Sequence, residues 1–182
     1  MRYTITTTTN IPGNSDPVST FEKNCITNVE LYKKIHEEAG TSFQLLENRI
    51  EGDTYIRKAI VQPPPNSVPA PVRAVLGAAA FGFKEETTYS FRTHEGVCEM
   101  SPLDARIAQK IKSKTKVSLR PSSPSKPRDV IELIDGEITA NIRFIGNKIE
   151  KDLVYQIKSK KPIITGLQAE ALAAAKVSAL AE

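Results

Sequence analysis

The sequence lacks tryptophan and contains only two cysteines, Cys25 and Cys98, and two histidines, His36 and His94. Disulfide-based folds usually carry four or more cysteines, so we expect two unpaired thiols, as in a reducing compartment. The two histidines lie far apart in the sequence, without further ligands at the spacing of a zinc site. We therefore expect neither a disulfide framework nor a metal site.

Long apolar stretches are also absent. The longest, residues 75–83, contains two glycines and is far shorter than the roughly 20 residues of a transmembrane helix. The first ten residues have no apolar segment typical of a secretory signal. We therefore expect a soluble protein of a reducing intracellular compartment, either the cytoplasm or, if a transit peptide has been removed, an organelle.

Familiar catalytic motifs are missing. The segment 77–82 lacks the lysine and hydroxyl of a phosphate-binding loop, and no G-x-S-x-G sequence occurs. The adjacent acids Glu37–Glu38 and Glu85–Glu86 point apart on a helix or strand, which makes them poor acid–base pairs. We expect no catalytic residues and no cofactor, but scattered groups lining a cavity would leave no linear motif, so enzymatic activity stays open.

Basic charge is concentrated in one segment of a chain whose net charge is +4. Residues 106–128 contain eight basic residues and no acid, whereas elsewhere 17 basic residues face 21 acids. Alternation with apolar residues predicts that four of the lysines share the outer face of one strand: Lys110, Lys112, Lys114 and Lys116. This basic face either keeps the strand solvated or binds an acidic protein surface or an anionic membrane. Nucleic acid is disfavoured, because no aromatic residues are interleaved for base stacking.

Periodicity predicts a chain of strands that ends in a helical region. Alternating and β-branched runs predict strands at residues 2–9, 41–51, 54–62, 84–93, 97–101, 105–120 and 129–144. Apolar spacings of three and four predict helices at residues 18–23, 28–39, 72–80, 148–158 and 167–181. Residues 101–111 also fit a helix, since Leu103, Ile107 and Ile111 are four apart, and this alternative stays open.

Four interruptions complete this outline. The prolines of residues 63–71 predict a stiff surface loop, and residues 121–128 predict a second loop. A change of apolar parity at Asp135–Gly136 predicts a bulge or turn. Pro162 is expected to break the terminal helix. We therefore divide the chain into a domain of residues 1–160 and an appended alanine-rich helix of residues 161–182.

Two segments resemble a known family. Residues 136–151, GEITANIRFIGNKIEK, resemble the last strand and helix start of a bacterial START-like family of uncharacterised function, and residues 68–77 resemble its proline-then-Leu-Gly segment. The resemblance implies an α+β helix-grip fold. In that fold a curved antiparallel sheet of six or seven strands wraps around a long C-terminal helix, and two short helices follow the first strand. START-like relatives such as the major birch pollen allergen and the polyketide cyclases bind apolar ligands between sheet and helix.

The resemblance therefore implies a non-catalytic module that binds an apolar or lipid-like ligand, with residues 63–82 flanking the cavity mouth. The residues that we expect to line the cavity, or to pack as plain core, are Ile56, Ile60, Tyr89, Phe91, Met100, Ile107, Ile111, Val117, Ile138, Ile142, Ile149 and Leu153. The alternative function is a structural or assembly subunit that docks on a larger complex through the basic face or the terminal helix.

Overall fold

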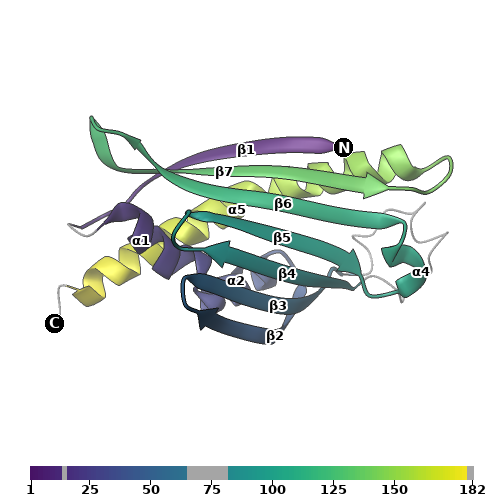
Figure 1. Ribbon diagram of the computed structural model, residues 1–182, viewed down its shortest axis with the longest axis horizontal. Helices are drawn as coiled ribbons and strands as arrows, with labels where there is room; N and C mark the ends of the chain where they lie inside the picture. The colour runs from purple at the N-terminus through teal and green to yellow at the C-terminus, as the bar shows by residue number, and fades with distance from the viewer. Residues whose placement is uncertain (14–15, 65–81, 180–182) are drawn as a thin grey trace.

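Seven antiparallel strands form one curved sheet in the computed structural model, which describes residues 1–13, 16–64 and 82–179 (Figure 1). The strands are β1 (Arg2–Asn10), β2 (Ser42–Glu51), β3 (Thr54–Gln62), β4 (Phe83–Ser90), β5 (Glu95–Pro102), β6 (Ile111–Ser123) and β7 (Lys126–Ala140). Their order across the sheet is β1-β7-β6-β5-β4-β3-β2. Sequential strands are therefore neighbours except at β1, which crosses over to pair with β7 and forms one edge.

The helices lie on one side of this sheet. They are α1 (Pro17–Phe21), the π-helical turn η1 (Glu22–Ile26), α2 (Val29–Glu38), the short α4 (Ala105–Ala108) and α5 (Gly146–Ala179). Side-chain caps start the first two α-helices: Asp16 accepts from the backbone N–H of Ser19 at 2.9 Å and Asn28 from that of Leu31 at 3.0 Å. The predicted α+β class, with a curved antiparallel sheet and a long C-terminal helix, is confirmed.

Residues 101–111 contain a helical turn rather than the favoured strand. Asp104 accepts a hydrogen bond from the Arg106 N–H at 2.9 Å and caps α4, so β6 begins only at Ile111. The loop predicted at residues 121–128 is also wrong, because β6 continues to Ser123 and β7 starts at Lys126. Lys110 therefore precedes the strand on which we expected it, whereas Lys112, Lys114 and Lys116 lie on β6.

No bulge interrupts β7 at Gly136. The residue stays in regular register, opposite Tyr3 of β1 and Thr115 of β6. A Cβ on Gly136 would lie 2.0 Å from Cζ of Tyr3, so the glycine makes room for the tyrosine ring. That ring crosses β7 and places its hydroxyl 3.0 Å from Oγ1 of Thr115.

Helix α5 continues through Pro162, so the predicted interruption is wrong. A proline inside a helix removes a hydrogen bond and costs about 3 kcal/mol, which other interactions must offset. Beyond it, Leu167 and Leu172 are buried in one cluster with Phe21 of α1 and Leu31 of α2. Whether residues 1–160 fold without residues 161–182 stays a prediction, and the expected helix at 72–80 lies outside the described residues.

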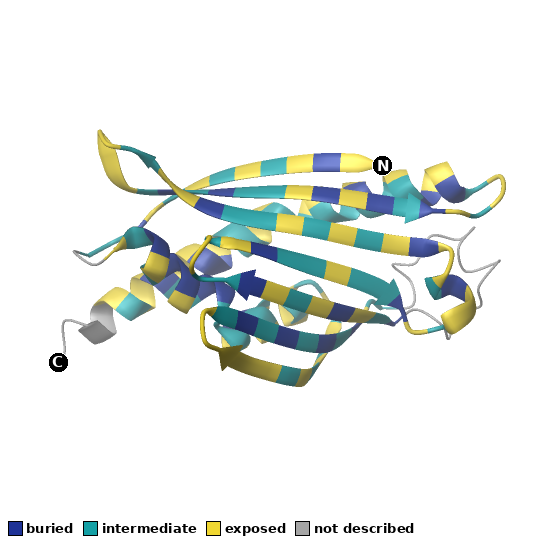
Figure 2. Cartoon of the chain, viewed as in Figure 1, coloured by how far each residue is buried: buried dark blue, intermediate teal, exposed yellow. Residues whose placement is uncertain are grey.

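Three apolar clusters lie between the sheet and the helices. The largest packs α1, η1, α2 and the C-terminal half of α5 against the sheet. The second joins α4 to the start of α5 through Ile107 and Ile149, and the third packs Tyr3 and Ile138 against Val154 of α5. Figure 2 shows the resulting alternation of more and less buried positions along the strands. The side of the sheet that faces the helices is called the inner face below.

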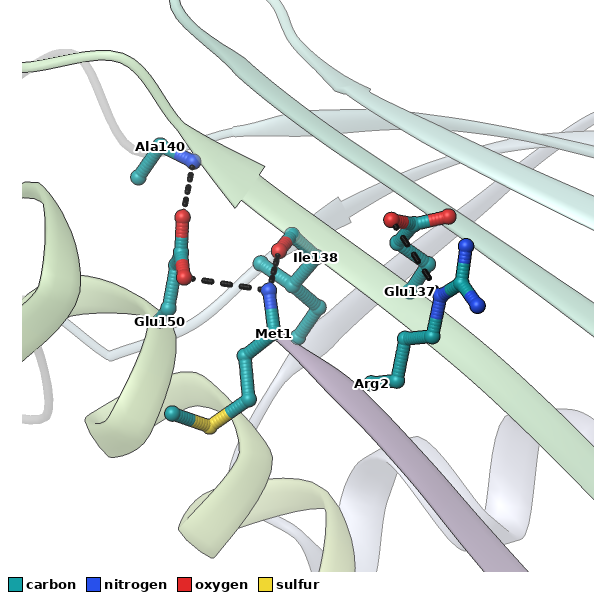
Figure 3. A network of polar contacts seen from close by, with 6 residues as sticks. All are labelled: Met1, Arg2, Glu137, Ile138, Ala140 and Glu150. Carbon is teal, nitrogen blue, oxygen red and sulfur yellow. Dashed lines mark hydrogen bonds and ion pairs between the residues drawn. The ribbon is translucent and has the colours of Figure 1, made fainter.

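A polar network fastens the ends of β1, β7 and α5 together (Figure 3). One carboxylate oxygen of Glu150 accepts from the Ala140 N–H at 2.9 Å, and the other lies 3.0 Å from the Met1 amino group. That amino group also donates to the carbonyl oxygen of Ile138. Glu150 thereby fixes where α5 starts relative to the end of β7.

We expect Glu150→Ala to destabilise the fold, because the Ala140 N–H and the Met1 amino group lose their common acceptor. Urea unfolding at pH 7 should show a loss of roughly 1–2 kcal/mol. The hydrogen bond from Ala140 lowers the pKa of Glu150. Its contribution is therefore complete above the unfolded-state pKa and lost as the pH falls through the lowered folded-state pKa. The difference from wild type should shrink below about pH 4.

The control is Glu137→Ala, which removes a carboxylate from the same corner. Glu137 forms an exposed ion pair with Arg2 at 3.6 Å, and pairs of this kind contribute little to stability. Equal losses in the two variants would contradict the special role of Glu150.

Candidate functional site

The inner face of the sheet is wider than the helix that packs on it. Seven strands about 4.8 Å apart span roughly 29 Å, whereas an α-helix with its side chains is about 10 Å across. Helix α5 packs against β7 and β1 and, further along, against η1 and α2, while α2 packs against β2 at the opposite edge (Figure 1). The middle strands therefore lie between the two main helix contacts.

Side chains of the middle strands stay half-exposed on the inner face. The register places Thr115 of β6, Cys98 of β5 and Thr87 of β4 in one row that begins with the buried Tyr3 and ends with Arg57. We define the inner strip as six half-exposed residues that lie in this row or next to it along the same face: Thr87, Cys98, Met100, Ser113, Thr115 and Val117. Met100 and Val117 supply apolar surface, and the other four supply hydroxyl or thiol groups.

The surroundings of the inner strip affect the pKa of the Cys98 thiol. Desolvation raises the pKa of its thiol to about 12, with the charge of Glu85 as the next cause. The side chain nevertheless keeps part of its accessible surface. The thiol is therefore kept in its neutral form by burial, although the residue is only half-buried.

A buried cation lies at the end of this row. The Arg57 side chain is 2% exposed and donates from Nη2 to Oε1 of Glu85 at 2.7 Å. Its guanidinium carbon lies 3.3 Å from the centre of the Tyr32 ring of α2, so the cation also contacts an aromatic face. Nε and Nη1 of Arg57 and the hydroxyl of Tyr55 are buried without a hydrogen-bond partner among the described residues. The wall of the interior is therefore polar here, not apolar.

Two further buried carboxylates connect the helices to the sheet. Glu22 of η1 accepts from the Tyr89 hydroxyl at 2.7 Å and lies 2.8 Å from Nδ1 of His94 in the β4–β5 turn. Glu132 of β7 pairs with Lys161 of α5. Desolvation, followed by the hydrogen bond to Glu22, raises the pKa of Tyr89 well above its usual range. Tyr89 therefore stays a neutral donor, which suits a structural contact.

The residues predicted to line the cavity divide among several environments. Ile107, Ile111 and Ile149 are buried in one cluster, with Ile142 and Leu153 packed against it. Ile138 belongs to the cluster around Tyr3, and Tyr89 and Phe91 belong to the largest cluster. Only Met100 and Val117 lie on the inner strip.

The prediction that Ile56 and Ile60 line the cavity is corrected by the structure. The buried positions of β3 are Tyr55, Arg57, Ala59 and Val61. Because successive residues of a strand point to opposite faces, Ile56 and Ile60 lie with Lys58 on the outer face. Both faces of β3 carry apolar side chains. The alternation of residues along the strand therefore does not show which face is turned inward.

The sequence analysis did not predict a role at the site for Arg57, for Glu85 or for the hydroxyl and thiol groups of the inner strip. Arg57 and Glu85 are 28 residues apart, and no local motif marks such a pair. The local signal in the sequence is Arg57 itself, a charged residue in the centre of a β-branched, aromatic run. In the sequence, Cys98 is recognisable only as an unpaired thiol.

The basic face is largely balanced by acids. On the exposed outer face of β6, Lys114 pairs with Glu99 at 2.8 Å and Lys116 with Glu95 at 3.0 Å. Both strands beside β6 supply acids, since β7 places Glu137 opposite Lys114. A shallow depression of about 410 Å³ on this face is lined by side chains of both signs: Arg2, Lys114, Lys116, Asp135 and Glu137. The part of the face with unbalanced charge is therefore the end near Lys110 and Lys112.

Comparison with known proteins identifies the fold. No known family model matches the chain, and no curated protein is significantly similar in sequence. Solved structures similar to this one include TTHA0849 from Thermus thermophilus, with a TM-score of 0.59 and 9% identity over 96% of this chain and 99% of that one. A START superfamily protein from Mycobacterium smegmatis has a TM-score of 0.56 and 10% identity over 94% and 98%. Ara h 8.0201 has a TM-score of 0.50 and 11% identity over 95% and 99%.

These likenesses establish the fold, and the predicted START-like helix-grip architecture is confirmed. Among residues 1–13, 16–64 and 82–179, no helix is both long and apolar enough to cross a membrane. Within the same ranges, His, Cys, Asp and Glu side chains form no group of three that could hold a metal ion.

We expect Glu85→Ala to be strongly destabilising, because it leaves the buried Arg57 cation without its carboxylate. Loss of one partner of a buried pair typically costs about 3–5 kcal/mol, which urea unfolding would measure. The double variant Arg57→Met/Glu85→Leu should recover most of this loss, since it removes both buried charges. A double variant no more stable than Glu85→Ala would show that the pair itself is not the source of the effect.

Proposed function

We propose that this START-like chain is a non-catalytic module that binds an apolar or lipid-like molecule between the inner face of the sheet and α5. The observation that carries the proposal is the half-exposed inner strip on the side of the sheet that faces the helices. Apolar side chains with accessible surface inside a fold are typical of ligand sites. The resemblance of residues 136–151 to a START-like family supports the same function.

The composition of the inner strip suggests the class of ligand. Met100 and Val117 favour an apolar body, whereas the hydroxyl of Ser113 needs a hydrogen-bond partner when water is displaced. The hydroxyl of Thr115 already lies 3.0 Å from that of Tyr3. A wholly apolar molecule would therefore leave Ser113 without a partner on that side. The best fit is an amphipathic lipid whose single hydroxyl, carbonyl or carboxyl group lies beside Ser113.

The chemistry of the described thiols supports binding over catalysis. Desolvation raises the pKa of both Cys25 and Cys98 to about 12, so both are neutral near pH 7. A nucleophilic cysteine needs the opposite shift, because the thiolate is the reactive species. The buried carboxylates Glu22, Glu85 and Glu132 already have cationic or hydrogen-bonding partners within the fold.

The alternative function, docking on a larger complex, stays a prediction. Leu167 and Leu172 of α5 already pack within this chain's own largest cluster, so the described part of that helix offers few apolar residues to a partner. Lys114 and Lys116 have acidic neighbours on β5. These contacts favour ligand binding as the leading proposal.

Binding of a fluorescent fatty acid tests this proposal. We expect saturable binding to the wild-type protein, and we expect Cys98→Leu/Ser113→Leu to weaken it by about tenfold or more, equivalent to 1.4 kcal/mol, because leucine fills space at the inner strip. The control is Thr88→Leu, on the outer face of β4, which should bind as wild type does. Circular dichroism melting would verify that both variants remain folded.

Failure of the wild-type protein to bind the probe, together with native mass spectrometry that finds no co-purified lipid, would overturn the proposal. Unchanged binding in the folded Cys98→Leu/Ser113→Leu variant would show that the probe binds elsewhere.

A further inference from the structure

A rigid connection between β7 and α5 projects one aromatic ring into solvent. Phe144 is 91% exposed and has a φ of 67°, a left-handed conformation that is costly for a bulky residue. Its neighbours Ile142 and Ile145 point inward and pack against the cluster of Ile107 and Ile149. The sequence therefore places an apolar side chain where it stays almost fully exposed.

Hydrogen bonds and a close backbone approach hold this connection in place. The Asn141 N–H donates to the Lys110 carbonyl at 2.7 Å, and the Gly146 N–H donates to the Ile142 carbonyl at 2.8 Å. A Cβ on Gly146 would lie 2.1 Å from the Ala140 carbonyl oxygen, so the glycine is required where α5 begins. The exposed ring of Phe144 is therefore a consequence of an ordered turn, fixed at both ends.

Basic residues lie at the same end of the molecule as this ring. The hydrogen bond between Asn141 and Lys110 brings the start of β6 beside the connection, and Figure 1 shows both at the same end of the sheet. The basic cluster consists of four exposed residues: Lys110, Lys112, Arg143 and Lys148. None of the four forms an ion pair with a residue that the structure describes. Residues 105–116 and 140–149 contain no acid, and Arg143 lies 4.7 Å from the centre of the Phe144 ring.

We propose that this end of the molecule docks on an anionic lipid bilayer, with Phe144 entering the interface and the basic cluster contacting lipid headgroups. Aromatic rings favour the membrane interface, and cationic side chains beside them are attracted to the negative surface potential. A single ring among cations needs no complementary pocket in a bilayer, whereas an acidic protein surface would need one to bury it. The proposal is independent of the ligand site, because neither Phe144 nor the basic cluster belongs to the inner strip.

The absence of tryptophan from the sequence allows a direct test. In Phe144→Trp the new side chain is the sole indole, and we expect its emission to shift to the blue on addition of phosphatidylserine–phosphatidylcholine vesicles. The shift should fade with added salt and be small with vesicles of phosphatidylcholine alone. The control is Tyr155→Trp, since Tyr155 is 74% exposed on α5, and its emission should not respond.

Vesicle co-sedimentation of tryptophan-free variants separates the two contributions. Phe144→Asn should weaken binding about tenfold or more through loss of the ring, while stability stays equal or rises, because asparagine tolerates a positive φ. Lys110→Gln/Lys112→Gln should weaken binding roughly 25-fold, at about fivefold for each charge. The matched control, Lys23→Gln/Lys126→Gln, removes two charges well away from Phe144, with Lys126 about 45 Å along β7, and should bind as wild type does.

An unchanged emission spectrum of Phe144→Trp with anionic vesicles, or an equal shift in Tyr155→Trp, would overturn the proposal. So would equal losses in the two lysine double variants, since attraction would then depend on total charge and not on this surface. Capture of an acidic protein that depends on Phe144, without vesicle binding, would replace the bilayer by a protein partner. Failure of fatty-acid binding, in contrast, would leave these results unaffected.

Discussion

The inner face of the sheet is about three times as wide as α5, and the organisation of the interior depends on that mismatch. Helix α5 packs against β7 and β1, and α2 packs against β2, so helix contacts concentrate toward the two edges. Thr87, Cys98 and Thr115, in the middle, keep accessible surface although they face the helices. A narrower sheet or a second long helix would have buried these side chains completely.

Charged pairs surround this central strip where a hydrophobic core would be expected. Arg57–Glu85 lies toward α2, Glu132–Lys161 joins β7 to α5, and Glu22 connects η1 to the β4–β5 turn. Such pairs are costly to desolvate and add little net stability, but breaking one is expensive. Glu132 and Glu22 therefore constrain α5 and η1 relative to the sheet. Arg57, held by Glu85 on the neighbouring strand, contacts α2 through the Tyr32 ring.

The two ends of the molecule differ in how their apolar residues are used. At the end that contains η1 and the C-terminal half of α5, Leu167 and Leu172 complete the largest apolar cluster. At the other end, Glu150 and Gly146 fix a turn that leaves Phe144 in solvent beside the basic cluster. A positive φ is costly for a bulky residue, so the contacts that fix this turn must offset the strain at Phe144.

Alternation and helical spacing are local properties of the chain, so the sequence by itself determined where most strands and helices lie. The fold class followed from the resemblance of residues 68–77 and 136–151 to a START-like family. Tertiary structure decided that Ile56 and Ile60 face outward, because both faces of β3 are apolar and only pairing with β2 and β4 selects the inner one. It also decided that α5 passes through Pro162, where packing of Leu167 and Leu172 outweighs a local cost. Arg57 and Glu85 meet only across neighbouring strands, so their ion pair, like the partly uncovered strip beside it, depends on contacts between residues distant in the sequence.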